Sequence, residues 1–240
     1  MSNPTVGESD ERARPDRVPE AFAYTIPFVV YLVGTVFVSR FEGAAYPVAY
    51  GVVAAIVAAV CIGLLRSREI LRPHWRIGPG VFLGVLGIVA WIVLSQLHLE
   101  GRIAPYLPEF LQPAERASYN PFEDLSNLGM IGFVAVRLFG IAILVPIAEE
   151  LFWRGFLLRW LIDTEWEKVK LGEYSLQSCA IVTLMFTAAH QEWFAAAAYC
   201  LLINGLLYWK KDLWQCIVAH AVSNALLVAY ILWSEEWWLW

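Results

Sequence analysis

Two adjacent glutamates, Glu149 and Glu150, occur within a long apolar stretch, and Arg154 follows four residues after the second. In a helix, residues four apart share a face, whereas adjacent residues point about 100° apart. Arg154 can therefore neutralise Glu150 and leave Glu149 directed elsewhere. A buried carboxylate without a counter-ion is suited to act as a general base. In the alternative interpretation, both glutamates lie near the membrane surface and pair with Arg154 and Arg159.

Two histidines add to this set of polar groups. The chain has four histidines, and His190 and His220 lie within apolar runs. His220 and Asn224 are four residues apart, so both side chains can reach one cavity from the same helix face. A single histidine on an apolar helix is more often a packed residue, but two of them with a glutamate pair and an asparagine favour a shared site. The other charge in this region, Arg137, is expected to extend to the outer membrane surface.

Seven long apolar segments must position these side chains. A membrane-spanning helix needs about 20 apolar residues, and an ionisable group at its centre costs at least ~2.5–3.5 kcal/mol, which makes such a group a candidate for function. The sequence predicts an all-α fold, a polytopic transmembrane helix bundle of about seven spans (six to eight). Pro146 is expected to kink the fourth segment, and one of the short fifth and sixth segments need not cross fully. The predicted segments are 21–39, 46–65, 77–97, 130–159, 176–191, 193–209 and 213–233.

The composition agrees with a membrane protein. The chain is 59% hydrophobic and 16% charged, whereas a soluble domain has about 25% charged residues. With a net charge of −5 and no basic stripe, the chain is expected to contact the lipid bilayer and no nucleic acid. The four cysteines are isolated within apolar segments, so we expect them to pack as small apolar side chains: Cys61, Cys179, Cys200 and Cys216.

Charges between the segments set the expected orientation. With the N-terminus in the cytoplasm, thirteen Lys and Arg residues face the cytoplasm and three face the outside, as the positive-inside rule requires. We expect a disordered cytoplasmic tail over 1–20 and N-terminal transmembrane helices with an outer loop over 21–127. The sequence of the loop over 98–127 does not indicate a function. We expect a short helix near 108–116 within this loop. The short chain and compact loops favour a prokaryotic cell (inner) membrane.

Three motifs in a fixed order resemble one known family, the CPBP intramembrane proteases (also called Abi proteins). This family includes the type II CAAX prenyl endopeptidases and the lysostaphin-resistance-protein-A-like proteins, and the resemblance covers roughly residues 135–230. It implies that residues 128–240 form an intramembrane protease core that acts on membrane-embedded or lipid-anchored (CAAX-like) proteins or peptides. The motifs are Glu149-Glu150-x-x-x-Arg154, Phe186-x-x-x-His190 and His220-x-x-x-Asn224.

The resemblance also implies a role for each motif residue. Glu149 would activate a water to attack the scissile carbonyl, assisted by His190. His220 and Asn224 would hold the oxyanion, a task suited to preorganised donors. Two further residues would orient and support the site: Glu150 and Arg154.

Three alternatives stay open. No cofactor is certain, but a zinc ion on His190, His220 and Glu149 would match the catalytic pattern of three protein ligands plus water, although HExxH is absent. The second alternative is a non-proteolytic immunity or scaffold protein on the same fold. The third is a proton-coupled carrier, for which Glu and His chains in helices are also typical, although the two halves show no paired broken helices.

Overall fold

The computed structural model describes residues 19–66, 70–108, 112 and 119–240, and within these ranges it contains helices and no strand. Almost all of the expected tail over 1–20, and most of the expected helix near 108–116, lie outside the described residues. The longer helices are α1 (Glu20–Val38), α2 (Ala45–Leu65), α3 (Gly78–Gln96), α6 (Asn127–Phe139), α9 (Leu176–Ala188), α10 (Trp193–Lys210) and α11 (Leu213–Ser234). The short ones are α4 (Leu99–Ile103), α5 (Pro121–Asp124), α7 (Val145–Glu150) and α8 (Leu158–Trp160).

Five segments of the described chain are long and apolar enough to cross a membrane. They confirm the predicted all-α polytopic bundle and make the protein an integral membrane protein. Helix α9 has 13 residues and spans only about 20 Å at 1.5 Å per residue. Helices α9 and α10 correspond to the two short predicted segments. The five long segments are Glu20–Val38, Ala45–Leu65, Gly78–Tyr106, Asn127–Trp160 and Leu213–Ser234.

The 34-residue segment Asn127–Trp160 is not a uniform α-helix. Two π-helical stretches, Gly140–Leu144 and Leu151–Leu157, flank α7. Pro146 lies two residues after the end of the first stretch and has no backbone N–H to donate. The kink expected at Pro146 stays a prediction, and what the structure shows on both sides of it is a local widening of the helix, a feature that often marks functional sites.

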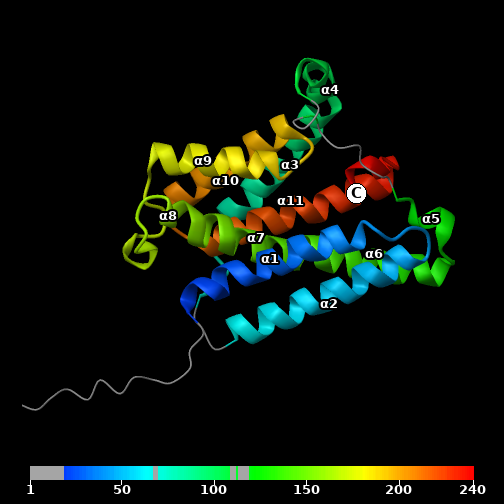
Figure 1. Cartoon of the computed structure of the whole chain (residues 1–240), viewed down its shortest axis with the longest axis horizontal. Coiled ribbons are helices and arrows are strands. Elements are labelled where there is room, and N and C mark those ends of the chain that lie inside the picture. The colour runs from blue at the N-terminus through cyan, green and yellow to red at the C-terminus, as the bar shows by residue number, and fades with distance from the viewer. Residues whose placement is uncertain (1–18, 67–69, 109–111, 113–118) are drawn as a thin grey trace, which may run out of the picture.

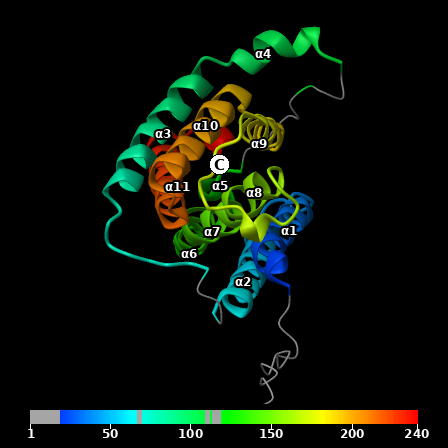
Figure 2. The same cartoon turned by 90° about the vertical axis from the view of Figure 1, so that its left-hand side faces the viewer.

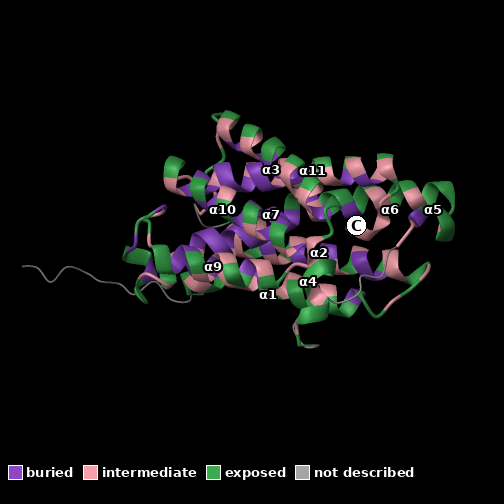
Figure 3. Cartoon of the chain, turned by 90° about the horizontal axis from the view of Figure 1, so that it is seen from above, coloured by how far each residue is buried: buried purple, intermediate pink, exposed green. Residues whose placement is uncertain are grey.

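Helix α7 lies at the centre of the bundle (Figures 1 and 2). On one side it contacts α1, which packs against α2. On the other side it contacts α11, which packs against α3, and α10 packs against both α3 and α9. Large apolar side chains of α1, α2 and α3 remain exposed, among them Val33, Val52 and Phe82. Figure 3 shows exposed residues along these helices and buried ones in the interior of the bundle. Exposed apolar faces around a polar centre are what a bilayer as solvent favours.

Glycines on α3 allow α11 to approach closely. A Cβ atom built on Gly80 would lie 2.7 Å from the backbone oxygen of Gln215, and one on Gly84 would lie 2.6 Å from that of Ala219. Small residues permit such backbone approach between membrane helices. Because Ala219 precedes His220, this contact helps to fix the position of His220.

We expect Gly84→Ala to destabilise the protein by about 1–3 kcal/mol, because the new methyl group meets a backbone oxygen that cannot rotate away. The measurement is the unfolding midpoint of the purified protein in detergent. Gly63→Ala is the matched control, since a Cβ there meets nothing within 4 Å and alanine is the better helix former. Equal midpoints for Gly84→Ala and Gly63→Ala would show that the α3–α11 contact is not as tight as described.

Candidate active site

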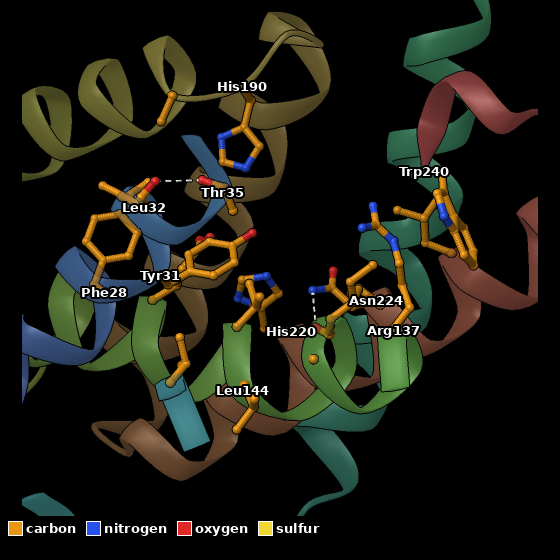
Figure 4. A pocket seen from close by; sticks show the side chains of 18 of the residues that line it. Phe28, Tyr31, Leu32, Thr35, Arg137, Leu144, His190, His220, Asn224 and Trp240 are labelled. Atoms are coloured by element: carbon orange, nitrogen blue, oxygen red, sulfur yellow. Dashed lines mark hydrogen bonds between the residues drawn. The ribbon is translucent and has the colours of Figure 1, made fainter. Parts of the chain in front are cut away.

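A cavity of about 530 Å³ opens beside α7, between α1, α2, α10 and α11 (Figure 4). The four residues that the sequence singled out, Glu149, His190, His220 and Asn224, all line it. Their convergence brings together three segments that are far apart in the chain. The other polar lining residues are Tyr31, Thr35, Ser39, Tyr46, Tyr50, Arg137, Gln191, Glu192, Tyr199 and Ser223.

The two adjacent glutamates have different surroundings. Glu150 is fully buried, and its Oε1 accepts hydrogen bonds from Arg154 Nη1 at 3.1 Å and from His220 Nδ1 at 2.8 Å. Glu149 is 6% exposed and lines the cavity, and its Oε2 has no hydrogen-bond partner. The predicted Glu150–Arg154 pair is thus present, and Glu149 is left as a carboxylate facing the cavity. Arg159 instead donates to the carbonyl of Gly155.

Arg154 connects the central helical segment to α10 and α9. Its Nε donates to Asn204 Oδ1 at 3.0 Å, and its Nη2 donates to the carbonyl oxygen of Cys200 at 3.3 Å. The guanidinium carbon also lies 5.2 Å from the centre of the Phe186 ring. The first and second motifs are therefore in direct contact, through Arg154 and Phe186.

Asn204, which is fully buried in α10, is a site residue that the motifs do not include. The sequence does carry a signal for this residue, because a lone asparagine in an apolar membrane helix is costly without a partner.

We expect Asn204→Leu to destabilise the protein by about 1–3 kcal/mol, because the Nε–H of Arg154 loses its acceptor. The unfolding midpoint in detergent measures this, with Asn127→Leu at an exposed position as control. A stability equal to that of the control would mean that Arg154 finds another acceptor.

The hydrogen bond to Glu150 orients the His220 ring and fixes a proton on its Nδ1. An ionised carboxylate only accepts, so Nδ1 of His220 carries the proton, and Nε2 is the ring nitrogen without a partner. The Tyr199 ring packs against His220 at 5.7 Å, and its hydroxyl donates to Ser223 Oγ at 3.0 Å. Ser223 in turn donates to the carbonyl oxygen of Gly84 at 2.8 Å. The imidazole is thereby held by α7, α10 and α3 together.

His190 is fixed in the same tautomer by a different partner. Its Nδ1 lies 2.7 Å from the carbonyl oxygen of Phe186, and a carbonyl only accepts, so Nδ1 carries the proton. The ring stacks on Phe186 at 4.4 Å and meets the edge of Trp91 at 5.6 Å. Nε2 is left for a group in the cavity, and it accepts a hydrogen bond when Nδ1 carries the only ring proton (Figure 4).

Asn224 is anchored to the widened part of the central helix. Its Nδ2 donates to the carbonyl oxygen of Ile141 at 2.8 Å. That carbonyl lies five residues before Pro146, which has no N–H to bond it in a π-helical pattern. The second hydrogen on Nδ2 is left for a group in the cavity. The proline and the π-helical stretch therefore help to place Asn224.

The side chain of Arg137 does not extend into solvent, and its expected place at the outer membrane surface stays a prediction. The side chain is 8% exposed and lines the cavity. Nη1 donates to the hydroxyl of Tyr46 at 2.6 Å, and the guanidinium carbon lies 4.8 Å from the Tyr50 ring and 5.1 Å from the Trp240 ring. These aromatic contacts hold the charge inside the protein.

No group of three His, Cys, Asp or Glu side chains among the described residues is arranged to hold a metal ion. Glu149, His190 and His220 line one cavity but do not form such a group. The arrangement of donors therefore does not fit the zinc alternative, and we derive no step through a metal. The four cysteines are free and buried, as expected for small apolar packing residues.

Comparison with known proteins identifies one family. Residues 131–226 match the family model of the type II CAAX prenyl endopeptidase Rce1-like proteins. This segment runs from α6 into α11 and contains all three motifs. No curated protein and no solved structure matches the chain. The resemblance inferred from the motifs is confirmed over this segment.

Proposed function

We propose, with the Rce1-like match as premise, that the protein is an intramembrane endopeptidase of the CAAX type. It hydrolyses peptide bonds of membrane-embedded or lipid-anchored proteins or peptides. The observation that carries this proposal is Glu149, a buried carboxylate that faces a cavity shared with two histidines, each oriented by a hydrogen bond at Nδ1. A structural residue would not need this arrangement, because an intramembrane carboxylate without a partner is costly.

In this proposal, one side of the cavity accepts hydrogen bonds and activates water. Glu149 presents a carboxylate whose Oε2 has no hydrogen-bond partner, and His190 presents Nε2 as an acceptor. A water molecule has two hydrogens, so it can donate to both groups and direct its lone pair at a scissile carbonyl carbon. Glu149 takes one proton from the water as the water oxygen bonds to the carbonyl carbon, which is general base catalysis. When the C–N bond of the tetrahedral intermediate breaks, Glu149 gives that proton to the nitrogen of the leaving amine and is a carboxylate again.

The other side of the cavity donates hydrogen bonds. Asn224 Nδ2 has one hydrogen left beyond its bond to Ile141. His220 donates from Nε2 when both of its ring nitrogens are protonated. The Glu150 carboxylate then stabilises the imidazolium, as the carboxylate of a catalytic triad stabilises its histidine. Two fixed donors directed at the developing oxyanion stabilise the tetrahedral intermediate.

Glu150 and Arg154 act as positioning residues in this mechanism. Glu150 orients His220, and Arg154 neutralises Glu150 while it is itself held by Asn204. The apolar part of the cavity wall includes Ile88 and Leu144, which suit aliphatic side chains of a peptide.

The test is cleavage of CAAX-type and other membrane-peptide reporters by the purified, detergent-solubilised protein. Wild type is compared with Glu149→Ala and His220→Ala, each with and without a chelator. We expect wild type to cut and both variants to be inactive, with no effect of the chelator. Loss of activity with the chelator would favour the zinc alternative. An inactive wild type across the panel, or variants that cut equally well, would leave the scaffold or the proton-coupled carrier as the function.

A further inference from the structure

Tyr31 on α1 is a cavity residue that the proposed hydrolysis does not use. It lines the same cavity as Glu149, His190 and His220, although it lies outside the segment 131–226 that matches the family model. In Figure 4 its ring extends from α1 into the cavity, and its hydroxyl lies between the rings of His190 and His220 in this view. Tyr31 and Glu149 are also close enough to interact electrostatically. The hydroxyl therefore faces the space in which a substrate would be hydrolysed.

The hydroxyl of Tyr31 is not used within the protein. Tyr31, Thr35 and Ser39 are spaced four residues apart, so they share one face of α1, and all three line the cavity. The hydroxyls of Thr35 and Ser39 donate to the carbonyl oxygens of Leu32 and Val36 in their own helix, at 2.8 and 2.9 Å. Within the described part of the chain, no group forms a hydrogen bond with the Tyr31 hydroxyl. Its proton is therefore free for a group in the cavity.

Packing holds the Tyr31 ring in place. Phe28, one turn earlier on α1, stacks on Phe152 at 4.5 Å and meets the edge of Trp153 at 5.3 Å. These contacts fix α1 against the π-helical stretch Leu151–Leu157. The Tyr31 ring itself packs against two apolar core clusters, one of which contains Phe28. The hydroxyl is thus positioned before any substrate binds, as an effective donor to a developing charge must be.

Packing alone does not require the hydroxyl. A phenylalanine would fill the same space, and a tyrosine hydroxyl away from water is costly without a partner. A phenolic O–H is a donor at neutral pH. The attacking water gains nothing from a donor, because such a bond draws electron density from its lone pair. The carbonyl oxygen of the scissile bond does gain, because it becomes negatively charged as the water adds.

We propose that Tyr31 is a third donor to the oxyanion of the tetrahedral intermediate, beside Asn224 and His220. This inference rests on the proposed endopeptidase function and adds a catalytic residue to it, from a helix that carries none of the three motifs. The hydrogen bond strengthens as charge develops on the oxygen, and no proton leaves Tyr31. The oxyanion is thereby held between α1 and α11.

The experiment measures kcat and KM of Tyr31→Phe on a membrane-peptide reporter that wild type cleaves, together with the unfolding midpoint in detergent. Tyr31→Phe should lower kcat by about 10²-fold, the lower end of the loss for a single oxyanion donor. KM and the midpoint should stay close to the wild-type values, because the variant loses no hydrogen bond within the protein. Tyr106→Phe is the matched control, at a position that is 88% exposed and outside the cavity, and should behave as wild type.

Binding of a peptide aldehyde gives a second readout, because its hydrate resembles the tetrahedral intermediate. Wild type should bind the aldehyde about 10-fold more tightly than Tyr31→Phe does, the difference expected for one hydrogen bond. The corresponding peptide alcohol, which forms no hydrate, should bind to both proteins equally. Equal binding of the aldehyde by the two proteins would overturn the proposal, and any loss of kcat would then be structural.

A wild-type kcat in Tyr31→Phe would overturn the proposal as well. A rise in KM alone would do the same, because the hydroxyl would then bind the substrate and not the oxyanion. Glu149→Gln, measured in parallel, separates this proposal from the proposed function. If Tyr31→Phe keeps its kcat while Glu149→Gln loses it, only the role of Tyr31 is wrong. If wild type cleaves no reporter, or Glu149→Gln keeps its kcat, the proposed mechanism fails and the role of Tyr31 fails with it.

Discussion

Glu149→Gln should lower kcat by about 10²–10⁴-fold, the usual contribution of a general base, with KM close to that of wild type. Glutamine keeps the shape of the side chain but cannot take the proton of the attacking water. The stability of the protein should not fall, because Glu149 Oε2 has no hydrogen bond to lose and an uncharged group is easier to bury. Initial rates over a range of reporter concentrations, with the unfolding midpoint measured in parallel, check this prediction.

Glu173→Gln serves as the matched control, because Glu173 is exposed and lies outside the cavity. It should leave both kcat and the midpoint at wild-type values. If Glu149→Gln kept wild-type kcat, Glu149 would not be the base. If instead it lost activity only through a lower midpoint, its role would be structural.

Arg154→Met should destabilise the protein by about 3–5 kcal/mol, the cost of leaving a buried charge without its partner. Both Arg154 and Glu150 are fully buried, so neither can turn towards water. The loss should also reduce activity, because Glu150 then holds His220 without a neutralising charge. The free energy of unfolding in detergent and the cleavage rate measure the two effects.

A double variant, Glu150→Gln with Arg154→Met, separates stability from catalysis. Removing both charges should recover much of the stability lost in Arg154→Met. Activity should not recover, because the carboxylate that stabilises protonated His220 is gone. Full recovery of activity would show that Glu150 does not act through His220, and no recovery of stability would show that the pair is not coupled.

The part of the site that could be predicted from the sequence is the part set by the geometry of a single helix. The Glu150–Arg154 pair and the divergence of Glu149 follow from the four-residue repeat of a helix. His220 and Asn224 share the cavity for the same reason. The apolar segments likewise predicted the all-α bundle, and Pro146 indicated where the long helix would depart from regular α-helix.

Contacts between distant parts of the chain could not be predicted in this way. The bond from Arg154 to Asn204 joins residues 50 apart, and the bond from Arg137 to Tyr46 joins residues 91 apart. A periodic pattern in one helix does not show which side chain of another helix it meets. The orientation with the N-terminus in the cytoplasm rests on the charge distribution and stays a prediction.

The most direct test of the central claim, that Glu149 activates a water, is a single turnover in H₂¹⁸O with enzyme in excess over reporter. Mass spectrometry then follows both the new C-terminal carboxylate of the product and the intact enzyme. We predict one ¹⁸O atom in the product carboxylate and none in the enzyme. Label in the Glu149 carboxylate, or a covalent acyl-enzyme, would show that Glu149 attacks the substrate itself and would contradict the account.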